Sequence, residues 1–397
     1  MKKTIFSIIL FFIFIFFISV AYLTFFGHET DKFNKIIKTE INKTDKGVNL
    51  NFEKISIKLD PVNFKLFIKF INPNINYFKV DLPLASLKTN INLKFLIEKK
   101  IVINDINLST KYLDLNKIKP LLRQANINKE DLKYLNSGKF RIKNLNLKLN
   151  DKLNIKKNFK FNGDIKSVNL KISNTYKIQN LISNFSYTKE SLVFTDMSCN
   201  LINKDNKKNE FFNGKIDILP KNNFHDLHIK FEVNNLKELI NVPLMNYDLS
   251  QAGKQKVETK LRINKKREIL IKNISISDKK NKFNIKDLHL DKKFNLINFN
   301  EISVNTYMDG QINNDFIIQN KKNIFIKGQV FDAKNLLKEI NKGSNKSKFL
   351  SQIKKNIEID FNKILKGANF PINKFRLVGK IEKGSFKKIL AKSDFGK

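Results

Sequence analysis

The sequence predicts a mainly β protein: one N-terminal transmembrane helix followed by a long curved antiparallel β-sheet groove with a few short helices. Three observations predict this class. The chain has an uncharged apolar run near its N-terminus, apolar residues at every second position over most of its length, and only 13 Gly and 7 Pro among 397 residues. This low share of Gly and Pro disfavours folds that need many tight turns. The 41% hydrophobic content, which includes 36 Phe, is too high for a disordered chain.

The first predicted element is a membrane helix over residues 5–26. This run has no charged residue, and its length at about 1.5 Å per residue is about 33 Å, enough for a bilayer core. Ser19-Val20-Ala21 resembles a signal-peptidase site, but the apolar run continues beyond it, which favours an uncleaved signal anchor over a signal peptide. Lys2 and Lys3 predict that residues 1–4 are cytoplasmic and that the rest is translocated. The predicted anchor residues are Ile5, Phe14 and Phe26.

A short amphipathic helix or linker is predicted over residues 27–48. Phe33, Ile36, Ile37 and Ile41 follow helical spacing, and Asp31 precedes them as an N-cap candidate.

From residue 49 to 330 the apolar period changes to two, which predicts strands with one apolar face. A recurring motif places two polar residues between two apolar-x-apolar pairs. The motif occurs at Ile101 to Leu108, Phe140 to Leu147, Leu192 to Cys199, Ile269 to Ile276, Phe283 to Leu290 and Ile297 to Val304. A step of three reverses the face unless a β-bulge absorbs the extra residue, so we predict long, bulged, curving strands. The alternative is a two-residue hairpin turn at Lys143-Asn144 or Asn104-Asp105, which leaves very short strands.

Helical inserts are predicted at Leu115 to Leu135, near Leu236 to Ile240, at Asp332 to Ile340 and at Phe349 to Lys355. Residues 331–397 are predicted to be a helical insert and the start of a further β module.

One apolar face per strand needs a cover, and the predicted helices are too few to supply it. A second sheet in a closed sandwich is one solution, and an apolar groove that holds a ligand is another. The candidate groove residues are Phe52, Ile57, Ile68, Phe95, Ile103, Phe140, Leu147, Phe194, Phe231, Ile271 and Phe299.

The net charge of +38 does not indicate nucleic-acid binding. Only five of the 75 basic residues are Arg, the Lys residues are spread, and a translocated domain does not meet a chromosome. Lys, Asn, Ile and Phe have A/T-rich codons, so a biased genome accounts for much of this composition. The lysines could also hold the protein along anionic lipid headgroups.

No pattern of catalytic, metal or cofactor-binding residues occurs. Gly-rich phosphate loops, nucleophile elbows and H-E-x-x-H motifs are absent, and Cys199 is the single cysteine. His225 and His228 are three apart on a predicted strand, which puts them on opposite faces. We therefore predict a protein that is not an enzyme and needs no cofactor.

The order of elements resembles the AsmA-like envelope proteins, whose relatives include YhdP and TamB. The likeness rests on the Pro-bounded strand Pro61 to Pro73, the segments Leu87 to Leu93 and Ile101 to Leu108, and the later Val330 to Leu337 and Phe361 to Val378. It implies a protein in the inner membrane with a single span, whose periplasmic β-groove carries phospholipid toward the outer membrane. Members that span the envelope are usually longer, so the chain is either a short member or a fragment of a longer bridge.

The leading hypothesis is therefore a non-enzymatic phospholipid carrier that serves outer-membrane biogenesis, with an envelope or outer-membrane protein as a further partner. The alternative is a membrane-tethered assembly scaffold that acts through protein contacts at exposed strand edges, without lipid cargo.

Overall fold

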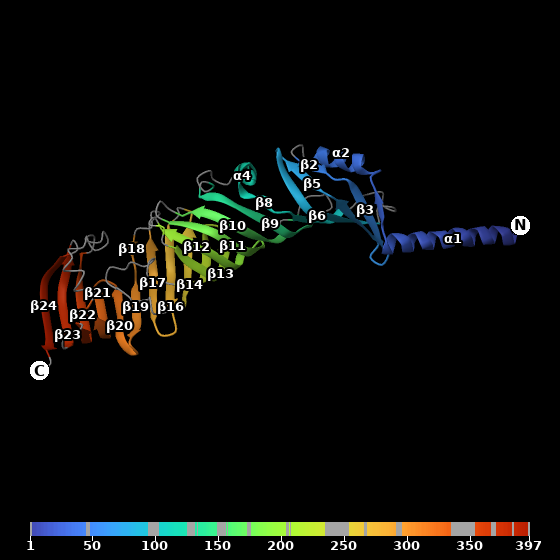
Figure 1. The fold of residues 1–397 in the computed structure, drawn as a ribbon. Coiled ribbons are helices and arrows are strands. Elements are labelled where there is room, and N and C mark those ends of the chain that lie inside the picture. Colours follow the sequence, from blue (N-terminus) through green and yellow to red (C-terminus); the bar gives the residue numbers. More distant parts are fainter. Residues whose placement is uncertain are drawn as a thin grey trace. The chain divides into compact units, whose positions relative to one another are not determined.

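The structure is a computed structural model. It describes residues 2–44, 48–93, 103–124, 132, 134–148, 156, 158–172, 176–203, 206, 208–234, 254–265, 268–290, 296–334, 354–366, 371–382 and 385–395, without the side chains of 2–9, 40–44, 104, 124 and 395. The chain divides into two compact units, Met1–Leu192 and Val193–Lys397. Most described residues of both units lie in strands, so the mainly β class with few helices is confirmed (Figure 1).

Unit 1 contains the described helices and two sheets that share a strand. Its elements are α1 (Lys2–Phe25), β1 (His28–Thr30), α2 (Asn34–Thr44), β2 (Val48–Asn51), β3 (Lys54–Asp60), β4 (Lys65–Ile71), β5 (Asn74–Tyr77), β6 (Val80–Asn92), β7 (Ile103–Thr110), β8 (Leu113–Asp114), α4 (Leu115–Gln124), β9 (Leu135–Lys148), β10 (Lys160–Lys171) and β11 (Tyr176–Tyr187).

The larger sheet of unit 1 is antiparallel in the order β1-β3-β4-β6-β7-β9-β10-β11, and β8 also pairs with β9. The first residues of β6 pair instead with β5, which pairs with β2 in a small second sheet. Leu84 lies between the two halves of β6 and is buried, so one long strand links the two sheets.

Helix α1 ends at the sheet. Gly27 follows it in the left-handed region, with φ 74°, and donates a backbone hydrogen bond to the Tyr22 carbonyl, a common way to end a helix. Among the residues whose side chains are described, no helix is both long enough and apolar enough to cross a membrane. The transmembrane role predicted for residues 5–26 therefore stays a prediction.

The two short helices of unit 1 occur where the sequence predicted helices, but their bounds differ in part from the prediction. Helix α2 begins at Asn34 and not next to Asp31, and the Asn34 amide donates to the Asp31 carbonyl. Helix α4 begins where predicted, after Asp114, whose carboxylate accepts from the Asn116 amide at 2.8 Å. It ends at Gln124, and residues 125–131 lie outside the description.

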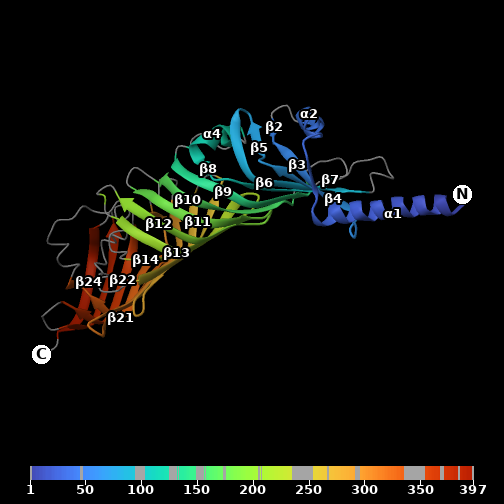
Figure 2. The same cartoon turned by 45° about the vertical axis from the view of Figure 1, so that its right-hand side comes forward.

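All elements of unit 2 with described bounds are strands, and Lys334, whose amide donates to the Asp332 carboxylate at 3.0 Å, is a single described helical residue at the predicted start of a helix. The strands are β12 (from Leu192 to Asn203), β13 (Lys208–Pro220), β14 (Phe224–Asn234), β15 (Lys254–Asn264), β16 (Ile269–Ser277), β17 (Lys282–Leu290), β18 (Leu296–Asn298), β19 (Glu301–Met308), β20 (Gln311–Asn320), β21 (Ile324–Asp332), β22 (Lys354–Leu365), β23 (Ile372–Glu382) and β24 (Ser385–Phe395). From β13 to β17 and again from β19 to β24 each strand pairs with the next in sequence, and both β18 and β19 pair with β17 (Figure 2).

Two expectations for unit 2 were wrong. Strands β21 and β22 are parallel, although the alternation predicted antiparallel strands almost throughout. The 21 residues from 333 to 353 separate them in the sequence, which is ample for the crossover that parallel strands need. Lys354 and Lys355, predicted to end a helix, open β22, where the Lys355 ammonium binds the Asn320 side chain at 2.6 Å. The helix predicted at 236–240 and most of those at 332–340 and 349–355 lie outside the described residues, although Asp332 itself ends β21.

The bulged strands are confirmed. Three residues have no partner in the register of the neighbouring strand: residue 104 opposite β6, Lys143 opposite β10 and Lys272 opposite β15. Each is one of the two polar residues between the apolar pairs of a predicted motif. The hairpin alternative is wrong, because residues 104–105 and 143–144 lie inside β7 and β9. Further shifts contain a residue in the left-handed region: Ser167, Asn180, Asn213, Lys374 and Lys388. The motif at Ile297 to Val304 differs, because Phe299 and Asn300 separate β18 from β19.

Candidate functional site: an apolar sheet face in each unit

Unit 1 has a row of apolar side chains that crosses its larger sheet. Cross-strand partners in an antiparallel sheet lie on the same face. Ile57 on β3 is paired with Ile68, Ile68 with Thr89, Thr89 with Ile106, and Ile106 with Leu147. All five side chains are half-buried. A second row runs beside it through Leu66, Ile91 and Ile103.

The same face continues over β9, β10 and β11. Leu145 pairs with Phe161, and Phe161 with Tyr187, whose ring stacks on it with the centroids 4.8 Å apart. Gly163 lies between Ile142 and Phe185 in the next row. A Cβ on Gly163 would overlap the backbone carbonyl oxygen of Arg141 and would also come 2.5 Å from Cζ of Phe185, which lies across the strand at this point. The bulge at Lys143 keeps the apolar residues of β9 on one side.

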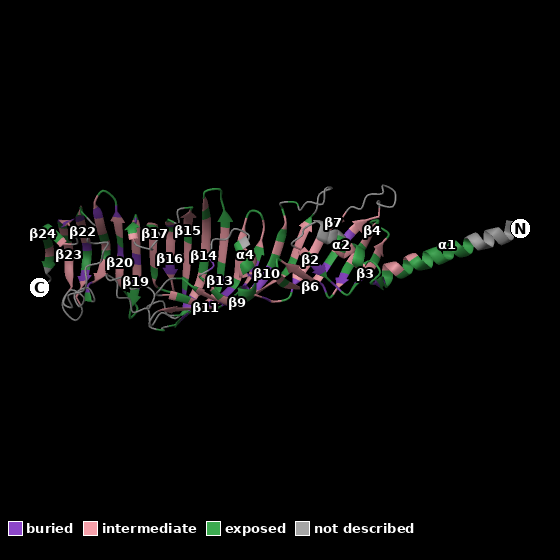
Figure 3. Ribbon diagram, turned by 90° about the horizontal axis from the view of Figure 1, so that it is seen from above, coloured by how far each residue is buried: buried purple, intermediate pink, exposed green. Residues whose placement is uncertain are grey.

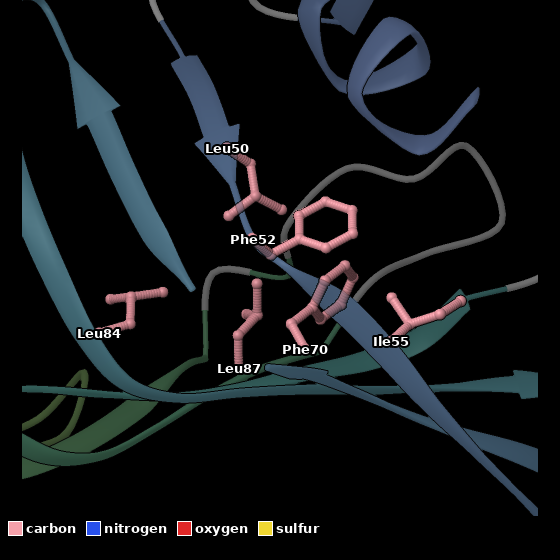
Figure 4. Packing of buried hydrophobic residues seen from close by; sticks show 6 residues of the cluster. All are labelled: Leu50, Phe52, Ile55, Phe70, Leu84 and Leu87. Carbon is pink, nitrogen blue, oxygen red and sulfur yellow. The ribbon is translucent and has the colours of Figure 1, made fainter. Parts of the chain in front are cut away.

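One end of the unit 1 face is covered. Leu50, Phe52, Ile55, Phe70, Leu84 and Leu87 form a buried cluster between the two sheets (Figure 4). The Phe52 and Phe70 rings meet edge to face at 4.9 Å, a favourable aromatic geometry. Ile37 of α2 packs against this cluster. Helix α4 buries Leu115 and Ile118 against β9 and its neighbours.

Unit 2 carries a longer row of the same kind, which crosses nine strands. The residues in it are Phe231, Val257, Ile276, Phe283, Val304, Phe316, Gly328, Phe361 and Phe375. Burial changes along the row: Phe231, Val257 and Phe283 are half-buried, whereas Val304 and Phe361 are 2% and 3% exposed. Figure 3 shows this alternation of buried and intermediate segments within the strands.

The buried part of the unit 2 row is rich in phenylalanine. The ring of Phe361 stacks on Phe331 at 5.3 Å, and Phe316 meets both rings edge to face. Gly328 lies opposite Phe316 and Phe361, where a Cβ would come 2.5 Å from Cβ of Phe316. Glycine therefore gives the rings room in the middle of a strand.

The opposite face of unit 2 is charged and internally paired. Ion pairs join neighbouring strands: Arg262 to Asp226 at 2.8 Å, Lys286 to Glu301 at 2.7 Å and Lys327 to Glu358 at 3.4 Å. His228 is hydrogen-bonded to Glu258 at 2.7 Å on the same face. The Arg262 bonds lower the pKa of Asp226, and the Lys286 and Gln319 bonds lower that of Glu301. Exposed pairs of this kind contribute little stability, but they mark this face as the one that meets water.

Among the described residues of unit 1, Asp164 is the buried charged residue on the polar face. Asp164 is 6% exposed and accepts from the Arg141 guanidinium at 2.6 Å, with the Lys143 ammonium 3.2 Å away. Burial raises the pKa of Asp164, but its hydrogen bonds outweigh this effect and the pKa lies below its usual value. The Tyr112 ring lies between the Arg141 and Lys166 cations. Arg141 and Lys143 both bind Oδ2 of Asp164, whereas Oδ1 is buried without a hydrogen-bond partner among the described residues, so the cluster is a structural ion pair that is satisfied on one oxygen.

The predicted groove residues fall into three groups. Ile57, Ile68, Ile103, Phe140 and Leu147 are half-buried on the unit 1 face, and Phe231 and Ile271 lie on the unit 2 face. Phe52 is instead part of the covered cluster, and Phe299 is buried between β18 and β19. Phe194 is half-buried in β12, and Phe95 lies outside the described residues.

Sequence reasoning missed the aromatic residues on the C-terminal strands, Phe283, Phe316, Phe361 and Phe375, as members of one row. The alternation that contains them was visible. The register that aligns them depends on strand pairing, which the sequence alone does not give.

The described residues contain no cluster of His, Cys, Asp and Glu that could hold a metal. Cys199 is buried, and burial raises the pKa of its thiol to about 11. His225 and His228 lie on opposite faces as predicted, because their partners Ile263 and Lys260 belong to the apolar and polar faces.

Comparison of the chain with protein-family models, with curated proteins and with solved structures gave no match.

Proposed function

We propose that this protein is a membrane-anchored, non-enzymatic carrier of phospholipid. The observation that carries the proposal is the continuous apolar row in each unit, half-buried over much of its length and backed by a charged opposite face. Acyl chains lie along the apolar rows, and headgroups extend toward the polar margins. Burial of each CH₂ contributes about 0.8 kcal/mol, and rows that are apolar apart from Thr89 let the chains slide.

The anchor is residues 5–26. Support comes from the absence of charge in this run and from the exposure of its described side chains: Phe11, Phe14, Phe16 and Phe17 are each 60% exposed or more in the free chain. Such a helix needs an apolar environment. With a cytoplasmic N-terminus, the sheet lies in the periplasm, and transport runs from the inner toward the outer membrane, as the resemblance to the AsmA-like proteins implies.

A photocrosslinking pair tests lipid carriage. A photoreactive phenylalanine at Phe231, on the apolar row, is compared with the same group at Phe212, which is also half-buried but pairs with Glu232 on the polar face. The expected result is phospholipid adducts at Phe231 and none at Phe212, detected by mass spectrometry of the irradiated full chain. Equal labelling of the two positions, or none at either, would refute the proposal.

A second candidate is an assembly scaffold without lipid cargo. It is favoured by β24, whose only partner among the described strands is β23 and whose Ile389 and Leu390 are exposed. Exposed edges accept strands from other proteins. In the same experiment a scaffold gives protein adducts at Leu390 and no lipid adducts at Phe231.

A further inference from the structure

The turn between β3 and β4 exposes apolar side chains. Val62 is 90% exposed and Phe64 is 53% exposed, and both lie in a tip that Pro61 makes stiff. The one acidic residue of the tip, Asp60, has its carboxylate engaged by the Asn63 amide at 3.0 Å and the Asn63 side chain at 2.8 Å. Lys58 and Lys65 flank the tip. The tip is therefore apolar with a basic margin.

This tip lies beside the C-terminal end of α1 (Figures 1 and 2). The Lys58 ammonium donates to the carbonyl of Phe25, in the last turn of α1, at 3.3 Å. β1, which follows the helix, pairs His28 with Ile57. These contacts belong to unit 1 and set the tip at the level where the uncharged run of residues 5–26 ends.

The end of α1 is itself aromatic. Tyr22 stacks on Phe26 at 5.8 Å, and Phe25 and Phe26 are about three-quarters exposed. Aromatic residues gather at the membrane surface, where one side of the ring is apolar and the other polar. Phe64 adds a further exposed ring in the β3–β4 turn.

Phe64 has an unfavourable backbone conformation, with φ 55°. For a bulky residue the left-handed region costs about 1 kcal/mol or more, and Gly or Asn would occupy it more easily. The Phe64 carbonyl accepts from the Leu93 amide at 2.8 Å, which holds the turn in place. The backbone of Phe64 is thus strained, although its side chain makes no contact with another aromatic ring among the described residues.

We propose that the β3–β4 turn is a second membrane contact, in which Val62 and Phe64 enter the interfacial layer of an anionic bilayer beside the end of α1. This inference rests on the proposed membrane anchor. The contact fixes the sheet against the surface, and it brings the first residues of the apolar row, Ile57 and Ile68, to the lipid from which cargo is taken.

The absence of tryptophan from the chain allows a direct test. Phe64→Trp places a single fluorophore in the tip, and Phe78→Trp places one in the β5–β6 turn as a control. Phe78 is similarly exposed, at 49%, and is also left-handed, with φ 45°. It lies beyond the opposite end of β6, because Val80 pairs with Tyr77 whereas Asn92 pairs with Lys65 of the tip.

Each full-length variant is reconstituted in vesicles of phosphatidylcholine and phosphatidylglycerol that are brominated near the headgroup end of the acyl chains. The proposal expects blue-shifted, quenched emission from Phe64→Trp and unquenched emission from Phe78→Trp. A further comparison places the tryptophan at Val62. Quenching of Val62→Trp alone is compared with quenching of Val62→Trp combined with Phe64→Asn, in which Asn suits the left-handed turn. The double variant is expected to show less quenching.

The outcomes separate this inference from the proposed function. If Phe64→Trp is unquenched while the chain floats with the vesicles and Phe231 still crosslinks lipid, the tip contact is wrong and the carrier stands. Equal quenching of both tryptophans also overturns it, because the protein then lies on the membrane without a preferred contact. If the chain does not float with the vesicles, the membrane anchor fails and the tip contact fails with it.

Discussion

The two units build the same one-sided sheet and complete it differently. Unit 1 covers part of its apolar face with α2, α4 and a small second sheet, so that Phe70 and Leu87 are buried beneath other elements. In the described part of unit 2 the elements are all strands, and its buried side chains are enclosed by aromatic neighbours such as Phe316 and Phe361. Bulges occur in both units. A period-two pattern with a three-residue step therefore specifies the sheet, while its cover depends on separate segments.

The largest expected effect lies in the covered cluster. Phe70→Ala should destabilise unit 1 by about 3–5 kcal/mol, because a fully enclosed ring is lost and a cavity remains. Phe231→Ala should cost unit 2 less, about 1–2 kcal/mol, because that ring is already half-exposed. Hydrogen exchange read by mass spectrometry assigns each loss to its unit. Phe67→Ala, on the exposed face of β4, serves as the control and should change stability by less than about 0.5 kcal/mol. Equal losses of stability in Phe70→Ala and Phe231→Ala would show that the apolar face of unit 2 is covered as well as that of unit 1.

The next largest losses of stability are expected in Gly163→Ala and Gly214→Ala, which differ in the atoms that the added Cβ would meet. A Cβ at Gly163 would overlap the carbonyl oxygen of Arg141, which is backbone, whereas a Cβ at Gly214 would overlap side-chain atoms of Phe231 and Met197. Both alanine variants should lose about 1–3 kcal/mol. Phe231→Leu should restore part of the loss in Gly214→Ala, while Phe185→Leu should not restore Gly163→Ala.

Chemical denaturation of the single and double variants measures this difference. Gly379→Ala is the control, since the nearest atom to its Cβ would be 3.5 Å away. Rescue of Gly163→Ala by Phe185→Leu would mean that the ring, and not the backbone, requires that glycine.

A smaller effect is expected at the Asp164 ion pair. Asp164→Asn should cost of the order of 1 kcal/mol at neutral pH, because Arg141 and Lys143 are partly exposed and water screens them. The lowered pKa of Asp164 means that its contribution is present above the unfolded-state pKa of about 3.9 and is lost as the pH falls through the folded-state value. The difference in unfolding free energy between the two proteins, measured by denaturation at a series of pH values, should therefore be constant near neutral pH and should narrow as the pH falls below about 3.9. Asp226→Asn in unit 2, where the pair is more exposed, should show a smaller gap, and a larger gap there would contradict the ranking.

The smallest effect concerns thiol chemistry. Cys199 should react slowly with a disulfide reagent near neutral pH, since burial restricts access and a pKa of about 11 leaves little thiolate. Ser183→Cys in a Cys199→Ala background places a thiol in unit 1 at a position 2% exposed. Slow labelling of both, measured by absorbance with time, indicates that neither strand opens readily. Rapid labelling of Cys199 alone would show that β12 is the weaker point.

Several features could be predicted from individual residues. Lys143 and Lys272 sit in the polar step between apolar pairs, and both are bulged in the sheet. Leu115 and Ile118 follow Asp114 at helical spacing, and α4 begins there. Local spacing carried these predictions, because bulges and helix starts depend on neighbours in the sequence.

Other features could not be predicted in this way. Phe52 alternates like its neighbours but belongs to the covered cluster, because it directly follows β2 of the small second sheet and packs with Leu50 against the larger sheet. Lys354 and Lys355 follow a segment with helical spacing but join β22, since β21 offers a parallel partner. Strand direction and cover depend on residues far apart in the chain, which no local pattern records.

By itself the sequence determined the one-sided strands, the bulges that keep each strand on one face, and the isolated charge-free helix at the N-terminus. The tertiary structure decided which apolar residues share a row, which of them are covered, and that the β3–β4 turn lies beside the end of α1. The physical reason is that periodicity fixes the face to which a side chain belongs, whereas register and packing between distant segments fix what that face meets.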